Sequence, residues 1–362
     1  MRIGIVNDLA IAREALRRAV EGRGGHRVSW VAHDGAEAVA RCRSDRPDLV
    51  LMDLVMPVMD GVEATRAIMR QAPCAILVVT SSVRDNASLV FRAMAAGALD
   101  AVDTPTVGND DGSVRLMSKV QEMADLVAPR AGACAASVSG RNGGAGVARA
   151  ESRAAEGSPP TPGPSGWGRP PILAIGSSTG GPGALAQVLA ALPADLGAPI
   201  VIAQHVDARF ATGLAEWLAG QARRPVRIAR EGDLPAPGAA LLAGTNDHLV
   251  LGPDLRFAYR KEPVAEPYRP SVNVLFDSLA RHWPRDGVAL LLTGMGRDGA
   301  SGLLTLRQLG WHTIVQDEAS SVVYGMPRAA VELGAAVEVL PVEQIGEAAR
   351  RALASKAPRS SP

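Results

Sequence analysis

Short apolar runs alternate with stretches whose apolar residues recur at helical spacing throughout residues 1–127. The alternation predicts strands and helices in turn. Apolar strands flanked by such helices are typical of a parallel sheet that is covered on both faces. The expected strands are Arg2–Asn7, Arg27–His33, Asp48–Leu54, Ala75–Ser82 and Leu99–Asp103, and the expected helices are Leu9–Glu21, Ala36–Ser44, Gly61–Gln71, Asn86–Ala96 and Ser113–Val127.

The same alternation resumes over residues 170–355 and predicts a second, doubly wound and mostly parallel α/β domain. Short strands and turns over Ala239–Arg260 suggest a hairpin excursion from its sheet. The expected strands are Ile172–Ser177, Pro199–Gln204, Val226–Ala229, Ala240–Ala243, Val288–Thr293, His312–Gln316 and Ala336–Leu340, and the expected helices are Gly183–Leu192, Ala208–Ala222, Val272–Trp283, Ala300–Leu309, Pro327–Leu333 and Glu343–Ala354.

Residues 128–169 have little apolar periodicity and are rich in Gly, Ala, Ser and Pro. Such a composition cannot bury enough surface to offset the entropy of ordering. We therefore expect a flexible linker there and a disordered tail over 356–362. A chain of 362 residues also fits two domains.

The composition narrows the class of protein. The net charge is +1 with no long basic block, which argues against nucleic acid as the main partner. No apolar run reaches the length of a membrane-spanning helix, and the N-terminus has no signal-peptide pattern. The cysteines Cys42, Cys74 and Cys134 are scattered, as in proteins of a reducing compartment. We expect a cytoplasmic protein that does not insert into a membrane.

Two acidic residues follow strands of the first domain. Asp8 comes after the first expected strand, and Asp53 ends the third one in LVLMDLVMP. The carboxyl ends of parallel strands share one edge of a sheet, and two carboxylates there favour a hard cation such as Mg²⁺. An aspartate neutralised by the metal can accept a phosphoryl group. Alternatively, Asp8 alone could begin a helix as its N-cap.

The first domain resembles a response-regulator receiver, a flavodoxin-like (βα)5 fold. The segment MDLVMPVMDG matches the phosphorylation segment of that family, and Thr80 matches the hydroxyl that senses the phosphoryl group. The resemblance implies that Asp53 is the phospho-acceptor. It also implies that Asp8, Asp53 and the backbone carbonyl of Val55 bind Mg²⁺.

This receiver departs from the family pattern at three places. Asn7 replaces one acidic residue of the usual pair, and Thr104 replaces the lysine that normally pairs with the phosphate. Ala101 stands at the aromatic switch position. These departures predict phosphorylation with an altered lifetime or a different response.

The stretch Ile172–Leu192 joins an apolar strand to an Ala/Leu-rich helix through Gly176-Ser177-Ser178-Thr179-Gly180-Gly181. A serine in a sharp strand-to-helix turn is held out of the sheet beside free backbone N–H groups. Ser178 is therefore a candidate nucleophile. Such turns also bind phosphates. A nucleotide loop is disfavoured, because the G-x-G-x-x-G spacing and the P-loop lysine are missing.

Two further polar residues follow buried strands of the second domain. His205 comes after PIVIAQ, and Asp298 lies in the glycine loop after VALLLTG. With Ser178 they would meet at one sheet edge, where a histidine can take the serine proton and a carboxylate can orient the histidine. Singly, His205 could be a structural histidine and Asp298 a helix cap. The order Ser, His, Asp differs from that of an α/β-hydrolase.

The segments AIGSSTGGP, IAQHV, EPYRPSV, LLTGMGRDGASG and VQDEASSVVYGMPRAAV resemble the chemotaxis-type response-regulator protein-glutamate methylesterases, the CheB family. The resemblance implies that Ser178 is the nucleophile, His205 the general base and Asp298 the orienting acid. It places Thr179 against the histidine and the Met295 N–H in the oxyanion hole.

Tyr268 and Arg269 lie in a family segment and are expected to shape the substrate groove, although Arg269 could equally be an exposed salt-bridge residue. The implied reaction is hydrolysis of glutamyl methyl esters, with glutamine deamidation as a further activity. The implied substrate is a methyl-accepting chemoreceptor-like protein, and the implied phosphoryl donor is a CheA-type histidine kinase. No metal is expected in the esterase step.

The opening MRIGIVND and the ending VDTP of the receiver are most similar to the branch of the surface-sensing Wsp pathway. The family resemblance also implies that the unphosphorylated receiver covers the esterase site. The alternative from a different class is a phosphoryl-accepting adaptor that binds a receptor or kinase and has little esterase activity.

Overall fold

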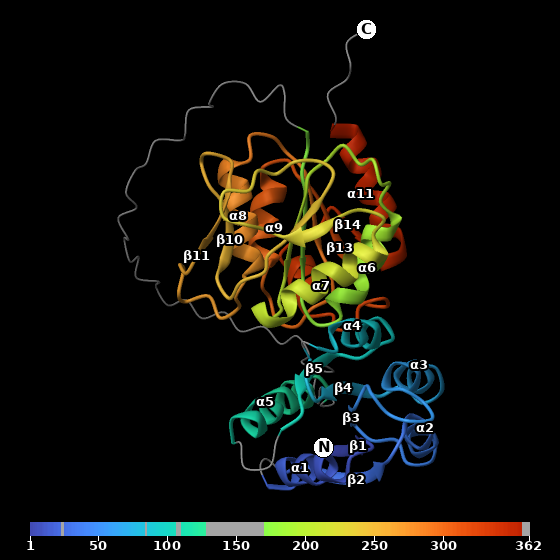
Figure 1. Ribbon diagram of the computed structural model, residues 1–362. Coiled ribbons are helices and arrows are strands. Elements are labelled where there is room, and N and C mark those ends of the chain that lie inside the picture. Colours follow the sequence, from blue (N-terminus) through green and yellow to red (C-terminus); the bar gives the residue numbers. More distant parts are fainter. Residues whose placement is uncertain (23–24, 84, 106–109, 128–169, 357–362) are drawn as a thin grey trace, which may run out of the picture.

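The computed structural model describes residues 1–362 except 23–24, 84, 106–109, 128–169 and 357–362. It forms two α/β domains, each built on a parallel sheet with helices on both faces (Figure 1). The expected linker lies outside the described residues. The expected tail, 356–362, begins one residue too early, because Lys356 is the last residue of a helix. The other residues of that tail, 357–362, lie outside the described residues.

The N-terminal domain has the strand order β2-β1-β3-β4-β5, which confirms the flavodoxin-like prediction. Each expected element is present, and the largest difference is the start of α5, at Asp110 rather than Ser113. The strands are β1 (Arg2–Val6), β2 (Arg27–Ala32), β3 (Leu49–Met52), β4 (Ala75–Thr80) and β5 (Asp100–Asp103), and the helices are α1 (Ala10–Gly22), α2 (Gly35–Ser44), α3 (Gly61–Gln71), α4 (Ala87–Ala95) and α5 (Asp110–Val127).

Aspartates fix where two of these helices begin. The carboxylate of Asp34 accepts a hydrogen bond from the Glu37 N–H, and that of Asp60 accepts one from the Glu63 N–H. Each bond satisfies an N–H that has no partner within its helix. The start of α3 is therefore set at the end of the segment MDLVMPVMDG.

The C-terminal domain has a parallel sheet in the order β14-β13-β12-β6-β7-β9-β8. The strands are β6 (Leu173–Ser177), β7 (Ile200–Gln204), β8 (Val226–Ile228), β9 (Ala240–Leu242), β10 (His248–Leu251), β11 (Phe257–Arg260), β12 (Val288–Leu291), β13 (His312–Gln316) and β14 (Glu338–Leu340). The helices are α6 (Gly181–Ala191), α7 (Ala208–Gln221), α8 (Val272–His282), α9 (Ala300–Gln308), α10 (Met326–Glu332) and α11 (Val342–Lys356).

The expected hairpin excursion is shorter than Ala239–Arg260. Its first strand, β9, pairs with β7 and β8 in the main sheet. Only β10 and β11 form a separate antiparallel pair. The apolar pattern predicts short strands here but not whether each one joins the main sheet or a separate hairpin, because a local pattern does not specify the pairing partner.

The order of the central strands locates a crevice. From β6 the chain continues through β7 towards one edge of the sheet, whereas β12, on the other side of β6, leads to β13 and the opposite edge. Ligand sites of open parallel sheets lie at such a reversal, outside the carboxyl ends of the strands. The loops after β6 and β12 meet there.

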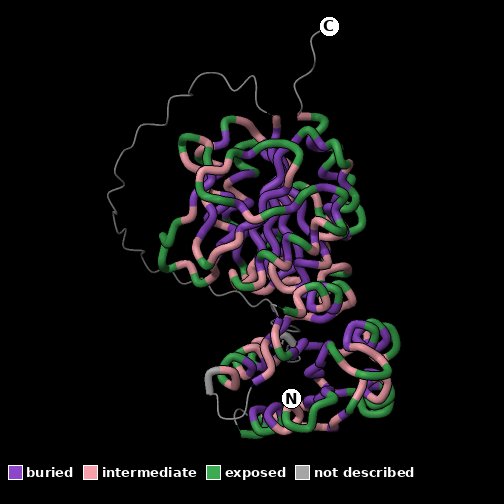
Figure 2. Tube along the Cα trace, in the orientation of Figure 1, coloured by how far each residue is buried: buried purple, intermediate pink, exposed green. Residues whose placement is uncertain are grey.

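Apolar side chains fill both sides of each sheet, and the strands are the most buried parts of both domains (Figure 2). In the C-terminal domain one core lies under α6, α7 and α11, and the other lies under α8, α9 and α10. No helix among the described residues combines the length and apolarity needed to cross a bilayer.

Helix α4 of the N-terminal domain packs on α6 and α7 of the C-terminal domain (Figure 1). Phe91 is 1% exposed and belongs to a core cluster of the C-terminal domain, where its ring centroid lies 5.9 Å from that of Trp217. The helices approach closely at Gly213, where an added Cβ would lie 2.5 Å from the Ala87 Cβ. The two domains therefore share an apolar interface centred on α4.

Candidate active site

Ser178 stands in the turn between β6 and α6. The turn ends at Gly180, the residue before α6. Gly180 has a φ of 77°, in the left-handed region that favours glycine. The Ser178 N–H donates to the Thr293 carbonyl at 3.0 Å, so the serine remains tied to the end of β12. The sequence prediction of a serine in a strand-to-helix turn matches this local structure.

His205 follows the neighbouring strand. Ser177 and Gln204 are register partners across β6 and β7, and the His205 N–H donates to the Ser177 carbonyl at 3.0 Å. Ser178 and His205 therefore follow directly after paired positions on strands that neighbour each other in the sheet.

Asp298 comes from the glycine loop after β12, and its carboxylate meets the histidine. Asp298 Oδ2 lies 2.7 Å from His205 Nε2, and the side chains are 2% and 10% exposed respectively. The carboxylate also accepts hydrogen bonds from Ser271 Oγ at 2.9 Å and from the N–H groups of Val272, Asn273 and Gly299 at 2.6, 3.0 and 3.0 Å. The donors at residues 271–273 lie at the start of α8.

The charge state of Asp298 follows from these partners. Burial favours the protonated form, but the hydrogen bond and charge of His205 and the N–H groups of Asn273 and Val272 outweigh it, so the pKa of Asp298 lies below its usual value of 3.8. The aspartate is thus a carboxylate at neutral pH. The alternative role of Asp298 as a helix cap holds in part: the carboxylate accepts from the Gly299 N–H, but its other protein donors besides His205 lie at the start of α8.

The orientation of His205 leaves one ring nitrogen for chemistry. Nε2 faces Asp298, while Nδ1 is buried and has no hydrogen-bond partner among the described residues. The Tyr268 ring stacks on the imidazole, with centroids 4.5 Å apart and planes 6° from parallel. No hydrogen bond joins Ser178 Oγ to the imidazole within the described part of the chain, and such bonds commonly tighten only when substrate is bound.

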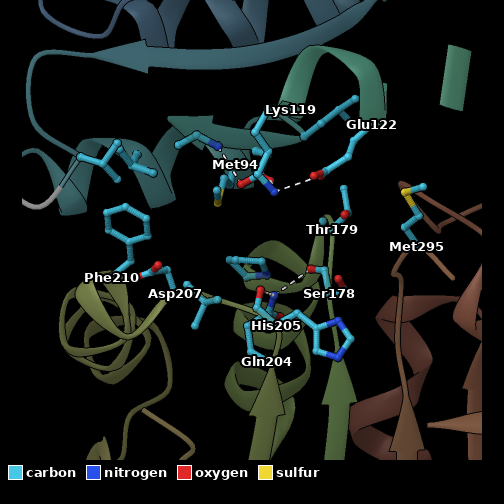
Figure 3. Close-up of a pocket in the computed structure, with 18 of the residues that line it drawn as sticks. Met94, Lys119, Glu122, Ser178, Thr179, Gln204, His205, Asp207, Phe210 and Met295 are labelled. Atoms are coloured by element: carbon cyan, nitrogen blue, oxygen red, sulfur yellow. Dashed lines mark hydrogen bonds and ion pairs between the residues drawn. The ribbon is translucent and has the colours of Figure 1, made fainter. Parts of the chain in front are cut away.

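Ser178 and His205 line a cavity of about 470 Å³. The other predicted residues of this site, Thr179, Tyr268, Arg269 and Met295, line the same cavity. The N-terminal domain forms its opposite wall through α4 and α5; Figure 3 shows Lys119 and Glu122 across the cavity from Ser178. The structure thus gathers all the predicted esterase residues around one space, with Asp298 directly behind His205.

Gln204 is a residue of this site that sequence analysis missed. It is 3% exposed; its Oε1 accepts from Ser177 Oγ at 2.6 Å, and its Nε2 donates to the carbonyls of Ser178 and His205 at 2.8 and 3.0 Å. One side chain therefore ties together the ends of β6 and β7. The available signal was a glutamine at the end of an otherwise apolar strand, since a buried amide needs partners.

A second candidate site lies in the N-terminal domain. Asp53 is 7% exposed and follows β3; its Oδ2 accepts from Asn7 Nδ2 at 2.7 Å, and its Oδ1 accepts from the Leu54 N–H at 2.7 Å. Burial and, to a smaller extent, the charge of Asp8 raise the pKa of Asp53 to about 6, against the backbone N–H groups of Leu54 and Val55, which lower it. Asn7 stands where an acidic residue is usual in the receiver family, and its side-chain amide donates to the Asp53 carboxylate.

The residues around Asp53 fit a magnesium ion. A cation between Asp8 and Asp53 would offset the repulsion that helps to raise the Asp53 pKa. Mg²⁺ commonly binds through one or two carboxylates and keeps several waters, so it needs no larger acidic cluster. Among the described residues, no group of three or more His, Cys, Asp or Glu side chains is placed to hold a metal ion.

Thr80 connects this site to α4. Thr80 is 1% exposed, and its Oγ1 accepts a hydrogen bond from Asn86 Nδ2 at 3.0 Å. Asn86 immediately precedes α4, the helix at the domain interface. At the same end of the sheet, Asp103 Oδ1 accepts from the Val83 N–H at 2.9 Å, and its Oδ2 lies 3.9 Å from Arg209 Nη1 of α7.

Comparisons with known proteins cover both domains. Residues 3–110 match the response regulator receiver domain, and residues 173–349 match the CheB methylesterase domain. Protein-glutamate methylesterase/protein-glutamine glutaminase 1 of Burkholderia lata is 53% identical over 349 residues, which cover 95% of this chain and 97% of that protein. The corresponding protein 2 of Burkholderia orbicola is 54% identical over 350 residues, again covering 95% and 97%. The crystal structure of the Thermotoga maritima CheB methylesterase catalytic domain is 34% identical, covers 50% of this chain and 98% of that domain, and has a TM-score of 0.49.

Proposed function

Because this chain belongs to the CheB family of receiver-linked protein-glutamate methylesterases, we propose that it hydrolyses glutamyl methyl esters on a methyl-accepting chemoreceptor-like protein. The observation that carries the proposal is His205, whose Nε2 contacts Asp298 and whose Nδ1 has no partner among the described residues, in the wall of a cavity that Ser178 also lines. A nucleophile, a base and an orienting acid are the groups that acyl transfer requires.

In the first half of the proposed reaction, Ser178 Oγ attacks the ester carbonyl carbon while His205 Nδ1 takes the hydroxyl proton. Asp298 keeps the ring oriented and stabilises the imidazolium that forms. The negative charge on the carbonyl oxygen would be stabilised by backbone N–H groups, among which we assign that of Met295, a residue on the cavity wall. The imidazolium then gives its proton to the departing methoxide, and methanol leaves.

In the second half, water attacks the acyl-serine and His205 takes a proton from it. The tetrahedral intermediate collapses, the proton returns to Ser178 Oγ, and the product is a glutamate side chain. A glutamine amide can pass through the same steps with ammonia as the leaving group. We therefore propose glutaminase activity at this site as well, with Thr179 and Arg269 lining the space that the substrate occupies.

The position of the receiver supports inhibition of the esterase before phosphorylation. Helix α4 packs on α6 and α7, and residues of α4 and α5 close one side of the catalytic cavity. A receptor segment would need that side open. We propose that a CheA-type histidine kinase phosphorylates Asp53, that Thr80 turns from Asn86 to the phosphoryl group, and that α4 loosens as its Asn86 contact is lost.

Asp8, Asp53 and the Val55 carbonyl would hold the Mg²⁺ for phosphorylation. When bound, the ion neutralises charge on the phosphoryl group during transfer. The chain's own residues supply the acceptor oxygen on Asp53, and the Asn7 amide, in place of a second acid, holds that carboxylate in position.

The receiver segments MRIGIVND and VDTP support a finer proposal, that the chain belongs to the branch of the surface-sensing Wsp pathway. The cytoplasmic location expected from the sequence stays a prediction. The proposed activity is tested by measuring methanol release from a receptor carrying labelled methyl esters, with and without acetyl phosphate. No release by the native chain would refute the activity, and equal release by Ser178→Ala would refute Ser178 as its nucleophile.

A further inference from the structure

The ring of Tyr268 stacks on the imidazole of His205. The two centroids are 4.5 Å apart and the planes differ by 6°, a stacked arrangement. Tyr268 lies three residues before Ser271, and the same segment supplies Ser271 Oγ and the Val272 N–H to Asp298. One stretch of chain therefore contacts both the histidine and its carboxylate.

The glycine loop passes close to the hydroxyl of Tyr268. An added Cβ on Gly296 would lie 2.9 Å from the Tyr268 hydroxyl oxygen, and Gly296 has a φ of 87°, so this approach depends on glycine. Tyr268 lines the cavity of about 470 Å³ that holds Ser178 and also a second one of about 280 Å³ that holds Asp298. The ring thus lies in the wall between the two.

A single hydrogen bond cannot fix the plane of an imidazole. Within the described residues the only polar contact of the His205 ring is Nε2 to Asp298, and the ring could still swing about that contact. The stacked phenol removes this freedom, because rotation of the imidazole would break the face-to-face contact. The plane of the ring is then fixed, and with it the position of the unpartnered Nδ1.

We propose that Tyr268 is a positioning residue for His205, which presents Nδ1 to Ser178, rather than a residue that mainly contacts the substrate. The proposal rests on the esterase function proposed above. An aromatic face also attracts a cation, so the stack stabilises the imidazolium that forms when His205 takes the serine proton. That stabilisation exists only after proton transfer begins, so it acts on kcat and not on substrate binding.

The test compares Tyr268→Leu and Tyr268→Phe in the full chain, phosphorylated with acetyl phosphate and Mg²⁺, with methylated receptor as substrate. Leucine removes the aromatic face, while phenylalanine keeps it and removes only the hydroxyl. We expect kcat of Tyr268→Leu to fall roughly 10- to 100-fold with KM changed less than about twofold, as for a misplaced catalytic group. Tyr268→Phe is expected to keep kcat within about threefold of the native value.

Tyr324→Leu is the matched control, since Tyr324 is a tyrosine of the same domain that contacts Arg328 and not His205. It is expected to keep native kcat. Tyr268→Met, which is also without an aromatic face, replaces the leucine variant if circular dichroism shows that variant to be unfolded.

Three results would overturn the positioning role. These are a raised KM with native kcat in Tyr268→Leu, equal losses of kcat in the leucine and phenylalanine variants, and native kinetics in both. Each of them presupposes a native chain that releases methanol through Ser178. A native chain without that activity is a different result, and it would refute the esterase function itself.

Discussion

The backbone N–H of Val272 donates to Asp298 Oδ2 at 2.6 Å, so the N-terminus of helix α8 holds the carboxylate that His205 contacts. Helix N-termini carry partial positive charge and free N–H donors, and both favour an anion. The orienting acid of the proposed triad is therefore fixed by a helix that begins 26 residues before it.

This arrangement predicts how stability depends on pH. The folded state lowers the pKa of Asp298 below 3.8, so its contribution is fully present well above pH 3.8 and is lost as the pH falls towards the folded-state pKa. We expect Asp298→Asn to lower the free energy of unfolding by about 2 kcal/mol or more at pH 7. Urea titrations should show the difference from the native chain shrinking by up to about 1.4 kcal/mol per pH unit below pH 3.8. A difference that stays constant down to pH 3 would contradict the assignment.

Gln204 offers a prediction about the backbone under the site. Gln204→Leu keeps the size of the side chain but removes the donor to the Ser178 and His205 carbonyls and the acceptor for Ser177. Leaving those buried groups without partners should cost about 1–3 kcal/mol of unfolding free energy. It should also lower kcat, because both strand ends become free to shift. A leucine variant with the native free energy of unfolding and native kcat would contradict this explanation.

Much of this site could be predicted from sequence, because its three side chains follow apolar strands and parallel strands end at a common edge. Ser178, His205 and Asp298 were each found in this way. The helix that holds Asp298 was not, because nothing local to Val272 indicates which carboxylate its N–H will meet. The stack of Tyr268 on His205 was missed for a similar reason, since it depends on the path of the segment between β11 and α8.

The elements of both domains could likewise be predicted from apolar periodicity, with ends that differ by a few residues. The packing of α4 on another domain could not. Phe91 has the spacing of an ordinary core residue of its own helix, and only the three-dimensional arrangement places it in the core of the C-terminal domain.

The interface leads to a prediction about inhibition. A side chain at Gly213 would collide with Ala87, because even a Cβ would lie 2.5 Å from the Ala87 Cβ. Gly213→Leu should therefore push α4 away and raise methanol release by the unphosphorylated chain severalfold. Gly220→Leu is the matched control on the same helix, since an added Cβ there meets nothing within 4 Å. Equal activity of the two variants would argue against inhibition through α4.

The proposed phospho-acceptor and magnesium site predict a difference between two aspartates of one segment. Asp53→Asn removes the phospho-acceptor, so acetyl phosphate and Mg²⁺ should no longer stimulate methanol release. Asp60→Asn is the control, because an asparagine still caps α3 and should leave stimulation intact. Mg²⁺ should also raise the melting temperature of the native chain more than that of Asp53→Asn. Stimulation that survives in Asp53→Asn would place the phosphoryl group elsewhere.

The most direct measurement is methanol release from a methyl-labelled receptor by the native chain, Ser178→Ala and Ser177→Ala, each treated with acetyl phosphate. Ser177 is the neighbouring serine, and its hydroxyl donates to Gln204 within the sheet. The account predicts that Ser178→Ala loses at least about 1,000-fold of the activity, as expected for a missing nucleophile. Ser177→Ala should retain most of it. Native-level release by Ser178→Ala would contradict Ser178 as the nucleophile, whereas no release by the native chain would contradict the esterase function and favour a phosphoryl-accepting adaptor.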